Sequence, residues 1–235
     1  MRDEYHPPLE EYLQVIEQLS DDGVTVIQAR VAERLNKTPP SVSEMIERLV
    51  DEGFVTRKGR ELQLTTNGHD VARSVIRKHR LAERLLADVI GLPWHLIHEE
   101  AGRWEHVMSD EVEKRIVALL NDPGTCPHGN PIPGSANEVT DRHEQRPMAD
   151  GDEGDVVRFA RLTEEAETDL VSLSEFNDVN FLPGATATFR TKGADGSIEL
   201  DVDGSSLRIR PKMTHQLFVV PVAETGSTTT APTER

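Results

Sequence analysis

Apolar residues near the start of the chain recur with the period of an α-helix. From Leu9 to Leu19 they fall on one helical face, with two prolines before the segment and Asp-Asp-Gly after it. The same pattern returns from Val26 to Leu35. After two consecutive prolines, which push the residues before them away from helical geometry, Ser41 can cap a third helix that ends near Gly53. The pattern therefore predicts three short helices.

Two short strand-like runs follow, residues 54–57 and 61–64, around the basic turn Lys58-Gly59-Arg60. Two helices joined by a tight turn and followed by such a hairpin have the layout of a winged helix-turn-helix. An ordinary small helical domain with a hairpin is the alternative, because helix-turn-helix spacing recurs by chance. In a winged helix, the third helix would enter the DNA major groove and the hairpin would contact phosphates. The candidate DNA contacts are Thr38, Pro40, Ser41, Ser43 and Glu44 on the helix, and Arg57, Lys58 and Arg60 on the hairpin.

Longer helices are expected in the middle of the chain. A broad apolar stripe predicts one over Asn67–Ile90, with shorter helices over Pro93–Met108 and Asp110–Leu120. The two shorter helices carry enough apolar side chains to cover either a partner subunit or a core of this chain, and the pattern alone does not choose. Residues 121–134, rich in Pro and Gly, exclude regular structure.

The rest of the chain predicts a small antiparallel β-barrel. Short strand candidates are separated by Gly- and Asp-containing turns, and one helical piece spans residues 164–177. The fold class expected is therefore α+β multidomain. The expected parts are a winged helix over 1–74, a helical domain over 75–140, a linker over 141–154, the barrel over 155–223 and a disordered tail over 224–235.

Composition narrows the possible function classes. The 235 residues include 26 basic and 42 acidic ones, a formal net charge of −16, which at first argues against nucleic-acid binding. The acidic excess is largest between residues 141 and 203, so a basic patch earlier in the chain can still meet DNA. The single Cys126 excludes an intramolecular disulfide and a Cys-based zinc ribbon. No apolar run reaches the roughly 18 residues of a membrane span, and the start is unlike a signal peptide, so we expect a cytoplasmic protein without a membrane partner.

Candidate metal ligands gather on the fourth and fifth expected helices. His79 and Glu83 are four residues apart, which places both on one helical face. The next helix offers His98 and the adjacent pair Glu105 and His106. Two imidazoles with carboxylates suit a divalent ion such as Fe(II), Mn(II) or Zn(II). A solvated charged face is the alternative for any one His–Glu pair, but so many candidates on adjoining helices favour a metal site.

The order of these parts resembles the diphtheria toxin repressor family of metal-dependent regulators. The likeness is densest in KHRLAERLLADVIGLPW at 78–94, HEEAGRWEHVMSDEVEKR at 98–115 and PHGNPIPG at 127–134, and the iron-dependent branch is the most similar. The resemblance implies an SH3-like terminal barrel and a homodimer that holds two metal ions per subunit and binds a palindromic operator in double-stranded DNA. It thus implies a repressor that senses Fe(II) or Mn(II) to control metal-uptake genes. A manganese-specific transport regulator of the same family is the alternative.

By position, the resemblance implies a first metal site of His79, Glu83 and His98. In the iron branch, a Glu and a Gln from the barrel domain complete that site. The matching positions here lie near Asp169 and Ser172, so the acid is kept in a shorter form and the amide is not.

The second site would use Glu105, His106, the residue at 102 and the one before the first-helix Tyr. Position 102 is Gly102, where the iron branch has Cys and the manganese branch has Glu, so only a backbone carbonyl is available there. Glu11 stands where the iron branch has Met and where the manganese branch has a carboxylate. An all-oxygen-and-nitrogen site suits Mn(II) or Fe(II) better than softer metals.

Metal at that second site would tie the first helix to the fifth and so bias the position of the DNA-reading unit. Glu44 stands where iron-dependent relatives carry Gln, and a carboxylate favours cytosine, so a different operator is expected. The rival from another class is an enzyme, since His79, Glu83 and His98 also form a two-His-one-carboxylate set. Nothing in the chain supplies its substrate pocket or general base. A structural metal without a sensing role is the third possibility.

Overall fold

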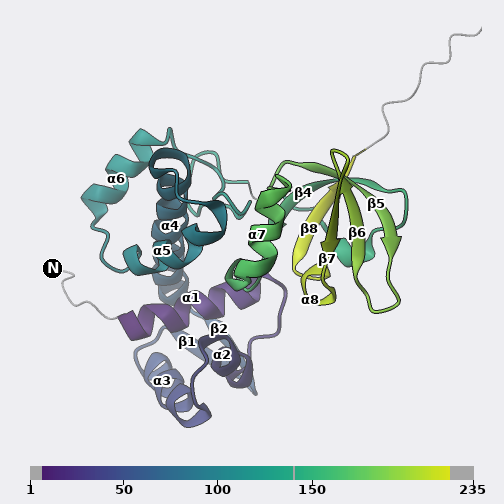
Figure 1. Ribbon diagram of the computed structural model, residues 1–235. Helices are drawn as coiled ribbons and strands as arrows, with labels where there is room; N and C mark the ends of the chain where they lie inside the picture. The colour runs from purple at the N-terminus through teal and green to yellow at the C-terminus, as the bar shows by residue number, and fades with distance from the viewer. Residues whose placement is uncertain (1–6, 140, 223–235) are drawn as a thin grey trace, which may run out of the picture. The chain divides into compact units, whose positions relative to one another are not determined.

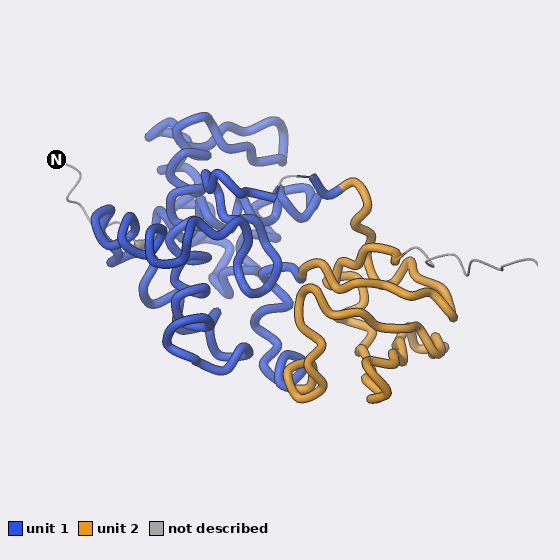
Figure 2. The backbone as a smooth tube through the Cα atoms, turned by 90° about the horizontal axis from the view of Figure 1, so that it is seen from above, with its two compact units in different colours: residues 1–142, 162–174 blue, residues 143–161, 175–235 orange. Residues whose placement is uncertain are grey.

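The computed structural model describes residues 7–139 and 141–222, which divide into two compact units. The first unit comprises residues 1–142 and 162–174, and the second comprises 143–161 and 175–235 (Figure 2). Within the described residues, no helix is long and apolar enough to cross a membrane. The tail expected to be disordered, 224–235, lies outside the described residues.

A winged helix-turn-helix opens the first unit, as the sequence predicted. Fully buried Val31, Val42 and Ile46 join its helices in one core, and α1 packs against both the hairpin and the following helix α4 (Figure 1). The elements are α1 (Pro7–Asp21), α2 (Gln28–Leu35), α3 (Pro39–Asp51), β1 (Val55–Lys58) and β2 (Glu61–Leu64), with the two strands antiparallel.

Helix α3 begins earlier than the sequence suggested. Thr38 occupies the N-cap with extended backbone, and Pro39 and Pro40 form the first turn. The prediction that Ser41 caps this helix was therefore wrong. The physical reason is that proline lacks an N–H and has a fixed φ, which suits the first turn, where N–H groups have no intrahelical partner.

Helix α4 (Thr66–Leu85) is the central helix of the first unit. The hydroxyl of Thr65 caps it by accepting a hydrogen bond of 3.2 Å from the Gly68 N–H. A π-helical turn (Leu86–Ile90) prolongs α4, and Gly91 ends it with φ of +76°. The helix expected over 93–108 is divided into a 3-10 turn (Trp94–Leu96) and α5 (Ile97–Trp104), and α6 (Asp110–Leu119) follows with Ser109 at its N-cap.

A six-stranded sheet dominates the second unit, in the order β3-β8-β4-β5-β6-β7. The strand pairs β3–β8, β4–β5, β5–β6 and β6–β7 are antiparallel. Phe159 stacks on Phe181 in the core with ring centroids 4.8 Å apart. The elements of this part of the chain are β3 (Arg146–Pro147), a 3-10 turn (Met148–Asp150), β4 (Val156–Leu162), β5 (Thr186–Lys192), β6 (Ile198–Val202), β7 (Ser205–Ile209), α8 (Pro211–Thr214) and β8 (Leu217–Pro221). Between β4 and β5, a 3-10 turn (Ala166–Thr168) and the first half of α7 (Leu170–Asp178) belong to the first unit.

Two segments differ from the sequence prediction. Residues 141–154, expected as a linker, include β3 and a 3-10 turn, because Met148 is fully buried and anchors the segment. The helix expected over 164–177 begins instead at Leu170, after a separate 3-10 turn at Ala166–Thr168. That separate turn lies in the first unit, where it carries residues of the site described next.

Candidate metal centre

Three imidazole rings of the first unit converge on one carboxylate oxygen. Oε1 of Glu83 lies 3.1 Å from Nε2 of His79, 3.3 Å from Nδ1 of His98 and 3.0 Å from Nδ1 of His128. His79 and Glu83 project from one face of α4 because they are four residues apart. His98 comes from the first turn of α5, and His128 from the loop after α6.

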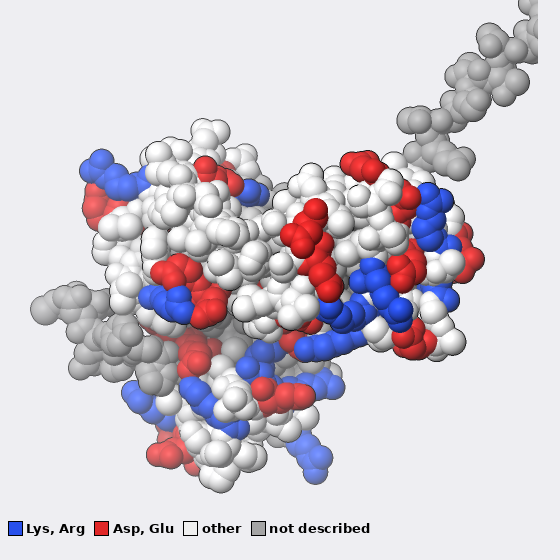
Figure 3. Space-filling model, viewed as in Figure 1, with Lys and Arg blue, Asp and Glu red and all other residues white. Residues whose placement is uncertain are grey.

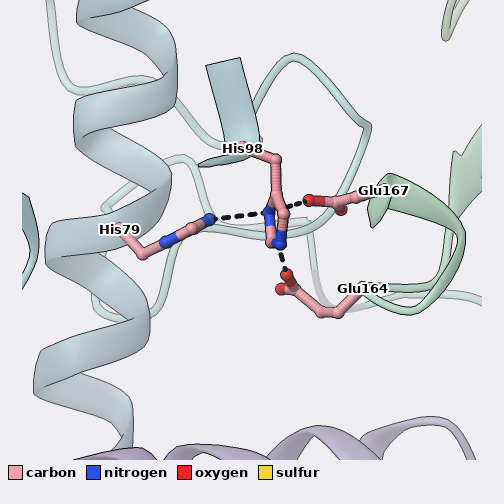
Figure 4. Close-up of side chains that lie close together, drawn as sticks. All are labelled: His79, His98, Glu164 and Glu167. Carbon is pink, nitrogen blue, oxygen red and sulfur yellow. Dashed lines mark hydrogen bonds and ion pairs between the residues drawn. The ribbon is translucent and has the colours of Figure 1, made fainter. Parts of the chain in front are cut away.

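Two glutamates complete this group: Glu164 shortly before the Ala166–Thr168 turn and Glu167 within it. Oε2 of Glu167 lies 2.7 Å from Nδ1 of His98, and Oε2 of Glu164 lies 3.8 Å from the same nitrogen. Figure 4 shows His79 and His98 reaching in from two helices toward these carboxylates. The side chains His79, His98, Glu164 and Glu167 offer ligand atoms that all lie within 4.8 Å of one another.

Buried polar contacts hold both glutamates in place. Arg80, one residue after His79, donates to Glu164 at 2.7 Å and to the Pro131 carbonyl at 2.6 Å. The amide of Asn130 donates to Oε1 of Glu167 at 2.9 Å. Since these supporting groups are themselves buried, the carboxylates are oriented before any ion binds.

A second set of ligand atoms adjoins the first. Glu83, Cys126 and His128 are all buried and offer ligand atoms within 4.8 Å of one another. Trp94 packs against His128 with ring centroids 4.9 Å apart and donates a hydrogen bond of 3.1 Å to the Pro127 carbonyl. Glu83 therefore belongs to both sets.

Burial and opposite charges set the protonation of these groups. Burial lowers the pKa of His98, but Glu167 outweighs it and raises that pKa to about 10. Burial likewise lowers the pKa of His79, yet Glu83 and Glu105 hold it well above its ordinary value. Burial and the neighbouring Glu164 raise the pKa of Glu167 to about 7. The cluster thus holds protons at neutral pH that a cation would displace.

A divalent cation fits these residues. Oε2 of Glu83, Nε2 of His128 and Oε2 of Glu164 are buried and have no hydrogen-bond partner among the described residues. A buried polar atom without a partner costs about 1–3 kcal/mol, and more when the group is charged. Metal coordination satisfies such atoms and neutralises the clustered carboxylates. The mixture of imidazole and carboxylate ligands suits Fe(II), Mn(II) or Zn(II), and a thiol ligand favours softer ions of this series.

The residues expected to form the second site do not converge on one point as those of the first site do. Nδ1 of His106 lies 2.8 Å from Glu10, whereas Nε2 of the same ring lies 3.1 Å from Glu105. The two carboxylates therefore face opposite sides of the imidazole. Glu105 also accepts a hydrogen bond of 3.2 Å from the buried Gln14 on α1.

Three expected ligands lie apart from these groups. Glu11 pairs with Lys37 at 2.6 Å, because its neighbour Glu10 occupies the α1 face toward His106. Asp169 accepts a hydrogen bond of 3.1 Å from the Ser172 N–H at the start of α7, and the preceding 3-10 turn directs Glu167 inward in its place. Gly102 lies on α5, and a Cβ atom built there meets nothing within 4 Å.

The candidate DNA contacts are mostly on the surface. Thr38, Pro40, Ser41 and Glu44 on α3 are exposed, Ser43 is half-buried, and the hairpin residues Arg57, Lys58 and Arg60 are exposed. Basic and acidic side chains are interspersed over the winged helix on the face drawn in Figure 3. On that face the described residues of the winged helix thus form no continuous basic patch.

Comparison with known proteins agrees with this arrangement. Residues 6–61 match the family described as "Iron dependent repressor, N-terminal DNA binding domain", and residues 65–134 match "Iron dependent repressor, metal binding and dimerisation domain". The iron-dependent repressor IdeR of Mycobacterium leprae is 40% identical over 229 residues, which cover 91% of this chain and 96% of that protein. The chain belongs to the iron-dependent repressor family, that of the diphtheria toxin repressor.

Other members of the family extend the match. The diphtheria toxin repressor of Corynebacterium diphtheriae is 36% identical over 224 residues, or 89% of this chain and 95% of that protein. A solved structure of a manganese-dependent transcriptional repressor in complex with manganese has a TM-score of 0.79 and 27% identity, and the match covers 91% of this chain and all of that one. As a member of the iron-dependent repressor family, the protein is a metal-dependent transcriptional repressor and not an enzyme. Its DNA-binding and dimerisation domains indicate DNA and a second copy of the chain as partners.

Some residues of the centre could not be picked out from the sequence. Glu164 and Glu167 lie in the charged run TEEAETD, which reads equally well as a solvated surface, and no spacing rule links them to His98. Cys126 and His128 stand two apart in the Pro- and Gly-rich loop, and the available signals were this spacing and the place of His128 in the segment PHGNPIPG. Glu10 and Gln14 share the polar positions of α1 with Glu11, and only packing distinguishes them.

Proposed function

We propose that this repressor senses Fe(II) in the cell and, in the metal-loaded form, binds a palindromic operator as a homodimer to control metal-uptake genes. The observation that carries the proposal is the convergence of His79, His98 and His128 on Glu83, within the same compact unit as the winged helix. A buried ligand cluster of this kind gives metal a differential affinity for two states of the unit, as a switch requires.

The first site is assigned to His79, Glu83, His98, Glu164 and Glu167. In this assignment Glu164 and Glu167 replace Asp169, the ligand expected from the sequence. The ligand set of Glu83, Cys126 and His128 adjoins it through the shared carboxylate of Glu83. The second site is assigned to Glu105, His106 and Glu11, with the backbone carbonyl of Gly102 on α5 as a further candidate ligand. Two metal ions per subunit follow from this assignment.

Mn(II) is the second candidate metal. At the expected second site, this chain has Gly102 where the iron branch has a Cys thiolate, and the carboxylate of Glu11 where that branch has Met. Both differences favour a harder ion. The likeness to the manganese-dependent repressor structure supports the same alternative. The thiol of Cys126 favours Fe(II) over Mn(II).

Exposed apolar side chains on the helices after α4 support the homodimer. Leu119 on α6 is 63% exposed and Val107, in the turn between α5 and α6, is 69% exposed, while Ile97 on α5 and Ile116 on α6 are buried inside the chain. Such side chains gain free energy when a partner covers them, at about 25 cal/mol per Å². The buried residues of α5 and α6 thus belong to an intrachain core, while Val107 and Leu119 are left for the proposed subunit interface.

The proposal is tested by anaerobic titration of Fe(II) and Mn(II) into the full chain with labelled duplex DNA. The duplex is first selected from random-sequence DNA by the metal-loaded protein, because the operator is not specified by the residues. The expected result is DNA binding that requires metal, is lost in Glu83→Gln and is kept in the surface control Glu99→Gln. DNA binding that is the same with and without metal would overturn the proposal.

A further inference from the structure

Lys37 has a fixed backbone position directly before the recognition helix α3. Asn36 ends α2 in the left-handed conformation, with φ of +50°, and the Lys37 N–H donates to the Ala32 carbonyl at 3.0 Å. The next residue, Thr38, is the N-cap of α3. The main chain at Lys37 is therefore tied to both helices of the helix-turn-helix, whereas its long side chain can change partner.

In this structure α1 provides both contacts of the Lys37 ammonium group. Nζ lies 2.6 Å from Oε2 of Glu11 and 5.3 Å from the centroid of the Tyr12 ring. The first contact neutralises the charge and the second is a cation–π interaction. The cation that directly precedes the N-cap of the recognition helix is thus held by α1, the helix that carries a proposed metal ligand.

The two neighbouring glutamates of α1 face different groups. Successive residues of an α-helix point about 100° apart, since one turn takes about 3.6 residues. Glu10 accordingly contacts His106, while Glu11 contacts Lys37. In this structure Glu11 faces Lys37 while Glu10 takes the place beside His106, so Glu11 would have to turn away from Lys37 to join Glu105 and His106.

We propose that Lys37 and the second-site metal compete for the carboxylate of Glu11, so that metal loading releases Lys37 to a DNA phosphate. The inference rests on the proposed function, in particular on Glu11 as a second-site ligand. A released ammonium at the N-terminus of α3 adds to the partial positive charge of that helix end, which favours phosphate. Metal binding would then add one cationic contact at the DNA surface.

The expected effects are modest because the pair is partly exposed. The side chains of Lys37 and Glu11 are 34% and 41% exposed, and exposed ion pairs of this kind change equilibria by about two- to five-fold. A divalent ion with several ligands overcomes such a competitor readily. One phosphate contact more or less changes the slope of log affinity against log salt by about 0.9.

The test uses the full chain with Lys37→Ala and the matched control Lys58→Ala, which removes one positive charge from the hairpin. Mn(II) affinity is measured by calorimetry in a His98→Ala background, which leaves the second-site residues intact. DNA affinity is measured with the duplex selected by the metal-loaded wild-type protein. Lys37→Ala should tighten Mn(II) binding about two- to five-fold and lower the salt slope of the loaded complex by about 0.9. Lys58→Ala should weaken DNA binding and leave Mn(II) affinity unchanged.

The variant Glu11→Gln tests the release of Lys37 by a measurement on the metal-free protein. This variant should steepen the salt slope of metal-free DNA binding, because Lys37 is no longer neutralised. Unchanged Mn(II) affinity in Lys37→Ala, or an equal change in Lys58→Ala, would overturn the competition. If the wild-type protein binds neither Fe(II) nor Mn(II), or binds DNA without regard to both, the proposed function itself fails, and that outcome is distinct from the other two.

Discussion

His79 contacts both groups of candidate ligands through its two ring nitrogens. Nδ1 lies 2.6 Å from Oε2 of Glu105, while Nε2 lies 3.0 Å from Nδ1 of His98 and 3.1 Å from Glu83. One nitrogen therefore faces the first site and the other faces a residue of the second. A histidine that gives one nitrogen to a metal usually donates the other N–H to a carboxylate, which fixes its tautomer and orientation.

Glu105→Gln should therefore weaken metal binding at the first site, although Glu105 is not a ligand of that site. The amide loses the negative charge that holds the His79 ring, so we expect about 10- to 100-fold lower affinity at the first site. Second-site binding should fall as well. Calorimetric titration with Mn(II) measures both. Glu99→Gln, at an exposed position of the preceding helix α5, is the control, and an unchanged first-site affinity in Glu105→Gln would contradict the role given to Glu105.

The metal-free protein should lose stability as pH rises. Hydrogen bonds to Glu10 and Glu105 raise the pKa of His106 to about 9, and Glu167 raises that of His98 to about 10. Because both folded-state values exceed the ordinary 6.5, the stabilisation is complete below pH 6.5 and is lost as pH passes through 9 to 10. Urea unfolding in EDTA across this range measures the effect. A stability that rises with pH over the window would show that these ion pairs do not form.

The same protonation predicts that metal binding releases protons. His98 carries a proton at neutral pH because its pKa is about 10, and a metal must displace it. Metal affinity should therefore rise with pH by up to about tenfold per unit for each proton released. Calorimetry in buffers of different ionisation enthalpy counts these protons directly. His98→Ala should release fewer protons than the wild-type protein, and an equal number would contradict this source.

Cys126→Ser should remove a thiolate ligand from the bound metal without disturbing the fold. The thiol is buried and its pKa is raised well above 9 by burial, so it ionises only when a cation is bound. With Co(II) as a probe, the wild-type protein should show thiolate-to-metal absorption in the near ultraviolet, and the variant should not. The absence of that absorption in the wild-type protein would remove Cys126 from the ligand set.

Gly102→Glu should strengthen the second site. A Cβ at this position meets nothing within 4 Å, so α5 accommodates the side chain, and replacing glycine within a helix also gains about 0.5–1 kcal/mol. The added carboxylate should tighten Mn(II) binding and raise the thermal midpoint of unfolding. Gly102→Ala separates the two effects, because it should raise the midpoint without changing metal affinity. Equal metal affinity in all three proteins would place position 102 outside the site.

The sequence by itself determined the elements and part of the metal centre. Helical periodicity placed α1 to α4, and the i, i+4 spacing of His79 and Glu83 sufficed to put both on one face of α4, since these relations are local. The turn residues between the two runs of residues 54–64 likewise specified the hairpin. The resemblance of the chain to the diphtheria toxin repressor family also indicated His98, Glu105 and His106 as metal ligands by their positions.

Only the tertiary structure decided which distant groups meet those residues. Glu164 and Glu167 join His98 because Arg80 and Asn130 hold their turn against α4, and such contacts leave no periodic trace in the sequence. The choice between Glu10 and Glu11 depends on the rotation of α1 against its neighbours, which packing sets. Side chains one residue apart on a helix differ by about 100° in direction, so a ligand assigned by alignment alone can face a different partner in the folded protein.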